Sequence, residues 1–243
     1  TGEAATITEE ERREIIKFCV KEVNGRIPLI VGSGSNCTAT AVKFSREAEE
    51  SGADGLLVVT PYYNKCNDDG LYAHYSAVAK STSLPIIVYN VPTRTGFNVK
   101  PIVYRKLAEI DNVVAIKEAN CCDEQLNGVL DNVKDILAVY CGSDDKLIDV
   151  LRRGGKGTIS VASNIIPSKI VDYIGDFENY FKTGFYKEIV NILQSDVNPI
   201  PLKYMVKLLY NEGYGLRLPL TEAKNEVKEA IYKIHQKTAG KIK

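Results

Sequence analysis

The chain alternates short apolar runs with longer amphipathic stretches. Six runs rich in valine and isoleucine recur along it, and none alternates apolar with polar residues as a half-exposed antiparallel strand would. Continuous apolar runs of this length are typical of strands in a parallel sheet that helices cover on both faces. We therefore predict six parallel strands, at residues 28–32, 55–61, 85–90, 113–118, 137–143 and 157–161.

Helical patterns fill the gaps between these runs. Thr8 and Glu11 form a capping-box pattern before a stretch that places Ile15, Ile16 and Cys19 on one face. Beyond residue 161 the strand signal stops and the apolar stretches have helical periodicity, so we expect a strand–helix repeat followed by a helical C-terminal region. The further helices predicted between the strands cover residues 38–51, 69–81, 99–109, 123–132 and 145–153.

This alternation predicts an α/β fold, either an open doubly wound sheet or a (β/α)8 barrel. The stretch GSGSN at residues 32–36 lacks the third glycine and the acidic residue of a dinucleotide-binding fold, which favours the barrel. Barrel enzymes carry their chemistry at the carboxyl ends of the strands. Polar residues gather at those positions here: Tyr62, Tyr63, Asn64, Tyr89, Asn90, Lys117, Glu118, Ser143, Asp144 and Asp145.

Lys117 is the first candidate for chemistry, because it ends an apolar run in the sequence AIKEA. A lysine at a strand end can simply extend its ammonium group to water. Alternatively, a lysine held among apolar residues loses solvation of its charged form, which lowers its pKa and frees the amine to attack a carbonyl. The residues leave both interpretations open.

Two tyrosines and an arginine could assist such an amine. Tyr63 and Tyr89 follow neighbouring predicted strands, and a phenol can donate a proton to a developing alkoxide and take it back. Arg94 follows Tyr89 in the VPTRTG loop, where a guanidinium could bind a substrate carboxylate. Each of the three could equally be an ordinary residue of a barrel rim or loop.

Composition narrows the function classes. The 31 basic and 31 acidic residues cancel, so the sequence predicts neither a nucleic-acid partner nor an anionic membrane partner. No stretch has the length of a membrane span, the start is polar and acidic, and six cysteines without a CxxC pair indicate reduced thiols, so we expect a cytoplasmic protein. Two histidines are too few for a usual zinc site, so no metal is expected. We expect no redox role for Cys121 and Cys122, and we expect Asp144 and Asp145 to cap the next helix.

Several motifs together resemble a known family. LLVVTPYYNK, PIIVYNVPTRTG, IKEAN, GTISVASN and NPIPLK, with TGEAAT at the start, are similar to the dihydrodipicolinate synthase branch of the N-acetylneuraminate lyase superfamily of class I aldolases. The similarity runs along nearly the whole chain. It implies a TIM-barrel-derived fold over residues 1–180 and a C-terminal helical domain over residues 181–243.

The resemblance also implies a reaction. It is the condensation of pyruvate with L-aspartate-4-semialdehyde to 4-hydroxy-tetrahydrodipicolinate, in lysine and diaminopimelate biosynthesis, through a Schiff base on a lysine and without a cofactor. Lys117 matches the Schiff-base lysine, Tyr89 the proton-shuttling tyrosine and Tyr63 the tyrosine lent by a neighbouring subunit. Arg94 matches the arginine that binds the semialdehyde carboxylate. Thr1, Gly142 and Ile159 match family positions that line the pyruvate pocket.

One departure from the family pattern changes these expectations. The family has a strand, a helix and a second strand before the motif in which this sequence starts, which agrees with six predicted strands instead of eight. The threonine that links the two tyrosines in the family is also absent from this sequence. Open sheet edges carry unpaired backbone groups, so we expect a homo-oligomer, a dimer or tetramer that could form by domain swapping, with weak or absent activity.

Three functions therefore stay open: this synthase, another pyruvate-dependent class I aldolase, and a non-catalytic barrel remnant that serves assembly. A substrate carboxylate opposite Arg94 would favour the first over the second. Feedback inhibition by lysine is expected to be slight, because Glu9, Arg12 and Thr40 stand where regulated relatives carry other residues.

Overall fold

The computed structural model describes residues 1–120, 122–180, 184–211 and 215–238. By its internal contacts the chain divides into two compact units. Residues Thr8–Ile159 form one, called here the strand unit, and Thr1–Ile7 with Ser160–Lys243 form the other, the helical unit. The predicted boundary between residues 180 and 181 adjoins residues outside the described ranges and stays a prediction.

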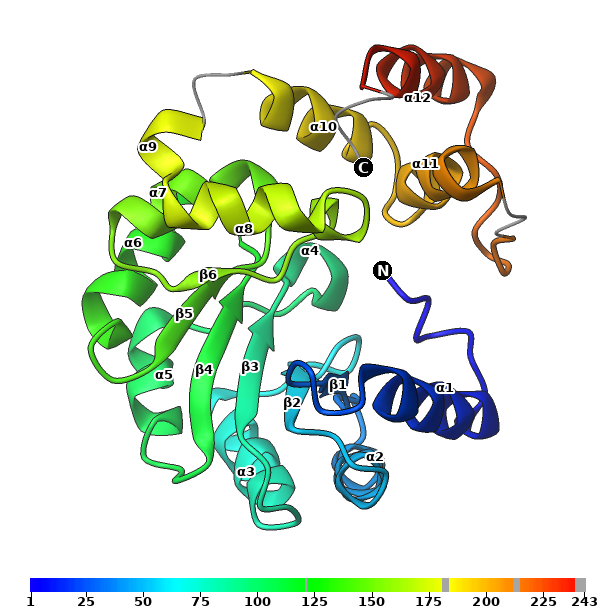
Figure 1. Ribbon diagram of the computed structural model, residues 1–243. Coiled ribbons are helices and arrows are strands. Elements are labelled where there is room, and N and C mark those ends of the chain that lie inside the picture. The colour runs from blue at the N-terminus through cyan, green and yellow to red at the C-terminus, as the bar shows by residue number, and fades with distance from the viewer. Residues whose placement is uncertain (121, 181–183, 212–214, 239–243) are drawn as a thin grey trace. The chain divides into compact units, whose positions relative to one another are not determined.

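The strand unit is built on one parallel sheet, whose six described strands lie in chain order, as Figure 1 shows. This confirms the six predicted strands and the α/β class, although each observed strand is no longer than its prediction, and all but the fourth are shorter. Within the described residues β1 pairs only with β2, and β6 only with β5, so the sheet has two edges. The strands are β1 (Ile30–Gly32), β2 (Gly55–Val59), β3 (Ile86–Asn90), β4 (Val113–Glu118), β5 (Ala138–Cys141) and β6 (Gly157–Thr158).

Helices connect these strands as the periodicity predicts. The first begins with the predicted capping box, in which Thr8 Oγ1 accepts from Glu11 N–H at 3.2 Å and Glu11 Oε2 accepts from Thr8 N–H at 2.8 Å. The four-residue helix α4 (Pro92–Thr95) is the one that the sequence did not predict. The others are α1 (Glu9–Val23), α2 (Thr38–Glu50), α3 (Asp68–Ala79), α5 (Pro101–Leu107), α6 (Asp123–Val133) and α7 (Leu147–Arg152).

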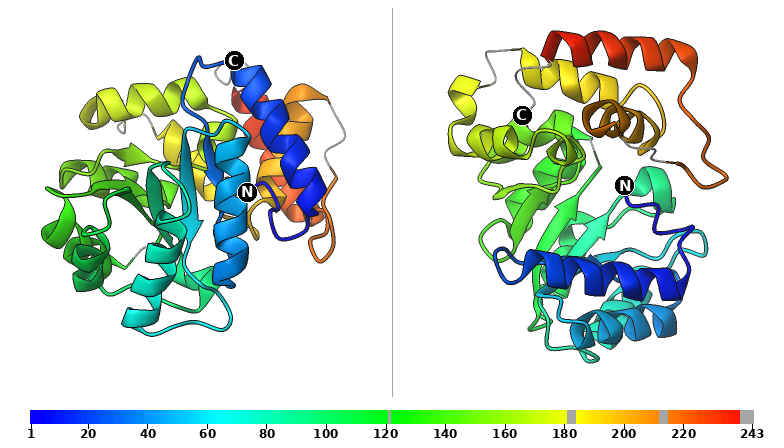
Figure 2. Two further views of the ribbon diagram at one scale, coloured as in Figure 1. Left: turned by 90° about the horizontal axis from the view of Figure 1, so that it is seen from below. Right: turned by 45° about the vertical axis from the view of Figure 1, so that its right-hand side comes forward.

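The sheet buries one face more deeply than the other. On β2 and β3 the side chains of Leu56, Val58, Ile86 and Val88 are fully buried, whereas those that alternate with them, Leu57, Val59, Ile87 and Tyr89, are only partly buried. Helices α3, α5 and α6 lie along the deeply buried face (Figure 1). Helix α1 lies against α2, which Figure 2 shows from two further sides, and Arg12 of α1 stacks its guanidinium over the Phe44 ring at 4.5 Å.

The helical unit confirms the predicted helical C-terminal region. Its core includes Tyr173 and Tyr186, whose rings meet edge to face at 5.2 Å. The chain start belongs to this unit because Glu3 forms an ion pair with Lys203 and accepts from Arg217 N–H at 2.9 Å. Its helices are α8 (Pro167–Gly175), α9 (Phe177–Tyr180), α10 (Phe185–Leu193), α11 (Ile200–Tyr210) and α12 (Asn225–Thr238), after the 3₁₀ turn η2 (Ala162–Asn164). None of the helices in the described ranges is both long and apolar enough for a membrane span.

Candidate active site

Three neighbouring strands place polar side chains side by side at their carboxyl ends. In the sheet register Tyr89 of β3 pairs with Lys117 of β4, and Lys117 pairs with Tyr140 of β5. Residues that pair across adjacent strands point to the same face of a sheet. Tyr89 and Lys117 therefore share the less deeply buried face, and the predicted pair is brought together.

The Lys117 amine is partly buried beside an aromatic ring. Its Nζ lies 4.1 Å from the centroid of the Tyr89 ring, and burial lowers the pKa of Lys117 to about 8, although the charges of Asp144 and Cys141 act in the opposite direction. At pH 7.5 an amine with this pKa is about one quarter neutral, against about one part in a thousand for an ordinary lysine. The neutral amine is the nucleophilic form, so this setting favours attack on a carbonyl.

Tyr89 remains a protonated phenol near neutral pH. Burial raises the pKa of Tyr89, and the positive charge of Arg94 partly offsets that rise. Arg94 lies on α4, the short helix that starts at Pro92 and ends before Gly96, a glycine with the positive φ of 67° that favours this residue type. A protonated phenol beside an amine can supply a proton to an alkoxide that forms there.

Tyr63 lies on the loop between β2 and α3, and its side chain is 90% exposed. Its φ of 68° is uncommon for a non-glycine residue, and its N–H donates to the Thr95 carbonyl of α4 at 3.3 Å. The loop is thus tied to the segment that carries Arg94, while the phenol itself faces solvent. The structure does not bring the Tyr63 hydroxyl to Lys117 within one chain.

Of the remaining predicted residues, Gly142 and Ile159 form main-chain hydrogen bonds at the ends of the strands, and Thr1 lies in the other unit. Gly142 N–H donates to the Glu118 carbonyl at 2.6 Å, and Ile159 N–H donates to the Cys141 carbonyl at 2.9 Å. These bonds extend the β4–β5 and β5–β6 pairings beyond the last strand residues. Thr1 belongs to the helical unit, where its Oγ1 accepts from Asn198 Nδ2 at 3.1 Å.

Directly behind this face is a buried polar network that the sequence did not predict. Glu118, 2% exposed, accepts hydrogen bonds from Asn90, Tyr104, Gln125 and the Asn120 N–H. Glu118 and Asn90 were recognised as polar residues at strand ends, but Tyr104 and Gln125 come from helices with no sequence signal for such a partner. Burial raises the pKa of Glu118, and the four donors oppose this rise.

One sequence prediction about the neighbouring loop is wrong. Asp144 and Asp145 do not cap a helix; they lie inside the 3₁₀ turn η1 (Asp144–Lys146), whose N-cap position is Ser143. Asp144 is buried there, and its charge favours the ammonium form of Lys117. The reason is the tight turn after β5, which places the acids one step beyond the cap.

The described residues hold no cluster of metal ligands, and their cysteines are free thiols. No group of three or more histidine, cysteine, aspartate or glutamate side chains there is arranged to hold a metal ion. Cys121 lies outside the described residues, and Cys122 is an exposed free thiol. The other described cysteines are also free thiols: Cys19, Cys37, Cys66 and Cys141.

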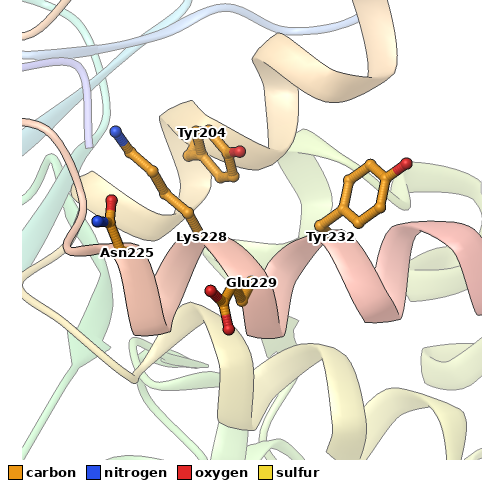
Figure 3. Close-up of a pocket in the computed structure, with 5 residues that line it drawn as sticks. All are labelled: Tyr204, Asn225, Lys228, Glu229 and Tyr232. Carbon is orange, nitrogen blue, oxygen red and sulfur yellow. The ribbon is translucent and has the colours of Figure 1, made fainter.

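A hollow lies in the helical unit, between α11 and α12 (Figure 3). Its lysine, Lys228, forms an ion pair with Glu222 at 2.6 Å. Its lining residues are Tyr204, Asn225, Lys228, Glu229 and Tyr232.

Comparisons with known proteins identify the family of the chain. Residues 1–238 match the model of the dihydrodipicolinate synthetase family. A 4-hydroxy-tetrahydrodipicolinate synthase of Alkaliphilus oremlandii is 46% identical over 227 residues, which are 91% of this chain and 78% of that protein. The dihydrodipicolinate synthase of Thermotoga maritima superposes with a TM-score of 0.93 at 37% identity, over 98% of this chain and 84% of that one.

A further solved structure holds a small molecule. It is the chloride-inhibited dihydrodipicolinate synthase of Acinetobacter baumannii complexed with pyruvate, which superposes with a TM-score of 0.92 at 35% identity over 98% of this chain and 84% of that one. These likenesses confirm the predicted resemblance and the barrel-derived fold with its helical C-terminal region. The chain belongs to the dihydrodipicolinate synthetase family, and it is an enzyme of the synthase type for which its relatives are named.

Proposed function

We propose that this chain condenses pyruvate with L-aspartate-4-semialdehyde through a Schiff base on Lys117. The observation that carries the proposal is the Lys117 amine itself, held 4.1 Å over the Tyr89 ring with a pKa lowered to about 8. A pyruvate complex of a relative of the same fold supports the first substrate. The second substrate rests on the names of the relatives and on the arginine of α4.

The first half of the reaction needs an amine and a proton donor. The neutral Lys117 amine attacks the keto carbon of pyruvate, and the resulting alkoxide takes a proton to give a carbinolamine. Loss of water, with a second proton delivered to the departing hydroxyl, gives the imine; Tyr89 is placed to carry these protons. Loss of a proton from the methyl carbon then gives an enamine, whose carbon is nucleophilic.

The second half joins the two substrates. The enamine carbon attacks the aldehyde of the semialdehyde, the aldehyde oxygen becomes a hydroxyl group, and the imine to Lys117 reforms. The free amine of the second substrate then attacks the imine carbon and displaces Lys117, which closes the ring and regenerates the enzyme. No cofactor takes part, because the imine itself accepts the electron pair.

The other family positions take supporting roles in this proposal. Arg94 would bind the semialdehyde carboxylate, since a guanidinium matches a carboxylate with two parallel hydrogen bonds. Gly142 and Ile159, both in the strand unit, would line the pyruvate pocket, and Tyr63 would serve the proton relay of another copy in a homo-oligomer. The 90% exposure of Tyr63 suits a side chain that completes a partner's site.

Borohydride trapping tests the proposal. The protein is mixed with pyruvate and reduced, and the adduct is located by intact mass and peptide mapping, with Lys117→Ala and the exposed Lys80→Ala as matched variants. We expect a single adduct on Lys117, retained in Lys80→Ala and lost in Lys117→Ala. The absence of an adduct under conditions that label a full-length relative would overturn the proposal and favour a non-catalytic assembly role.

The coupled assay with L-aspartate-4-semialdehyde separates the remaining alternatives. Turnover that falls in Arg94→Ala is expected for the proposed second substrate. An adduct on Lys117 without turnover of this aldehyde would point to another pyruvate-dependent aldolase. The same preparation is used to measure the turnover rate, the oligomeric state and the inhibition by lysine.

A further inference from the structure

Glu118 follows Lys117 on β4 and points to the opposite face of the sheet, because successive strand residues alternate. Its carboxylate is 2% exposed and fully engaged. Oε1 accepts from Asn90 Nδ2 at 2.9 Å and from Asn120 N–H at 2.8 Å, and Oε2 accepts from Tyr104 at 3.1 Å and Gln125 Nε2 at 3.2 Å. Five hydrogen bonds in all reach this group, since Asn90 Nδ2 also lies 3.1 Å from Oε2.

The partners of this carboxylate are all neutral groups. Among the described residues no lysine or arginine is recorded as a hydrogen-bond or ion-pair partner of Glu118. Keeping a carboxylate out of water without a cation is costly, and an apolar side chain of similar size often stabilises a core equally well. Stability of the fold alone therefore does not explain a glutamate at this position.

The network ties together two strands whose pairing is irregular. Ile86 pairs with Val113 but Ile87 pairs with Ala115, so β4 carries one extra residue, Val114, at the start of the pairing. A shift of one residue moves every side chain of a strand to the other face. The register beyond this irregularity decides whether Lys117 lies beside Tyr89.

Asn90 and Glu118 fix that register from behind. They are the register partners directly after Tyr89 and Lys117, and they are joined by the Asn90 amide. Asn90 is held in turn, because its Nδ2 donates to Asn98 Oδ1 at 2.9 Å and its Oδ1 accepts from Val99 N–H at 3.3 Å. The Asn90–Glu118 pair is thus adjacent to the Tyr89–Lys117 pair on the same two strands.

We propose that Glu118 is a positioning residue, which acts through its bond to Asn90 to hold the Lys117 amine over the Tyr89 ring. This inference rests on the proposed function for the reason why the amine must be positioned. The geometry itself is that of the protein without substrate. In Glu118→Gln an NH₂ group replaces one of the two acceptor oxygens, so the five hydrogen bonds cannot all form and the clamp is weakened. The Lys117 side chain then gains access to water.

Reactivity of Lys117 toward acetic anhydride measures this effect without pyruvate. Competitive labelling over a range of pH, read by peptide mass spectrometry, gives the pKa of the amine in each variant. The ionisable groups around Lys117 are its register partners Tyr89 of β3 and Tyr140 of β5, and Asp144 of η1 and Cys141 of β5, whose charges favour its ammonium form. All four are unchanged in the variants. Labelling therefore reports the setting of the amine.

We expect Glu118→Gln to raise the pKa of Lys117 from about 8 toward its ordinary value and to lower labelling at pH 8 roughly ten-fold. Asn90→Ser should do the same, which keeps the test valid if one variant fails to fold. Leu107→Ala, which removes a fully buried side chain of α5, is the control. It should lower the midpoint of thermal unfolding and leave the pKa of Lys117 unchanged.

An unchanged labelling profile in folded Glu118→Gln and Asn90→Ser would overturn the proposal, and so would an equal change in Leu107→Ala. Pyruvate trapping on the same samples separates the two ideas. If labelling of Lys117 shifts in the variants as expected but the wild-type protein traps no pyruvate, the proposed function is refuted and the positioning role stands.

Discussion

Gly142 allows a sharp test of the packing beside the site. A Cβ atom placed on Gly142 would lie 2.6 Å from the Ala119 Cβ, 2.9 Å from the Glu118 carbonyl oxygen and 3.0 Å from the Ala119 Cα. Non-bonded carbon atoms are most stable about 3.5–4.0 Å apart, so the two strand ends must separate by about 1 Å. Two of the three obstructing atoms belong to the backbone, which cannot rotate away.

We therefore expect Gly142→Ala to lower the free energy of unfolding by about 1–3 kcal/mol, the usual cost of overpacking. Part of the loss comes from the 2.6 Å bond between Gly142 N–H and the Glu118 carbonyl, which the separation weakens. Urea unfolding measures the difference. Gly32→Ala is the matched control, because a Cβ there meets only the Leu57 carbonyl oxygen at 3.9 Å.

Gly142→Ala should lower the reactivity of Lys117 as well as the stability of the protein. Moving the end of β4 displaces Lys117, so pyruvate trapping in Gly142→Ala should slow even in protein that is fully folded. If the unfolding free energies of Gly142→Ala and Gly32→Ala agree within about 0.5 kcal/mol, the reasoning is refuted. Normal trapping in a destabilised Gly142→Ala would show that the strand end moves without Lys117.

Three further predictions concern Tyr89, His74 and Thr8. Tyr89→Phe should slow imine formation on the order of 10²–10⁴-fold in a single-turnover trapping experiment while the unfolding free energy changes little; a near-normal rate would remove Tyr89 from the mechanism. His74 is buried, which lowers its pKa below the unfolded value of 6.5, so the unfolded chain takes up a proton first and stability should decline as pH falls through 6.5. In urea unfolding, the loss of unfolding free energy between pH 7.5 and pH 5.5 should be smaller in His74→Phe than in the wild-type protein. An equal loss in the two proteins would contradict this. Thr8→Ala should cost about 1 kcal/mol of stability through loss of the capping box, and no change in thermal unfolding would mean that the cap is dispensable.

The strands and the helix starts were predictable because their causes are local. Runs such as Ile86–Asn90 carry their β-branched residues in the sequence itself, and Thr8 reaches Glu11 within one helical turn. The helix α4 escaped prediction, since four residues between Pro92 and Gly96 are too few for any periodicity. Asp144 and Asp145 show the same limit, because a shift of one residue separates a cap from a 3₁₀ turn.

The site was predictable only in part, for a different reason. Lys117 and Tyr89 stand out because each ends an apolar run, and parallel register then brings them together. The support behind them depends on contacts between distant residues, such as Asn90 with Glu118 and Tyr104 with Glu118, 28 and 14 positions apart. Nothing in the local sequence marks a tyrosine of α5 as the partner of a carboxylate on β4.

The proposed Schiff-base function predicts that Lys117 is the nucleophile of this enzyme. Borohydride trapping with pyruvate as a function of pH tests this most directly, because it reports the bond, the residue and the ionisation of the amine together. An adduct confined to Lys117, whose rate of formation rises with a midpoint near pH 8, is the predicted result. An adduct on other lysines, or a rate that rises only near the pKa of an ordinary lysine, would contradict the account.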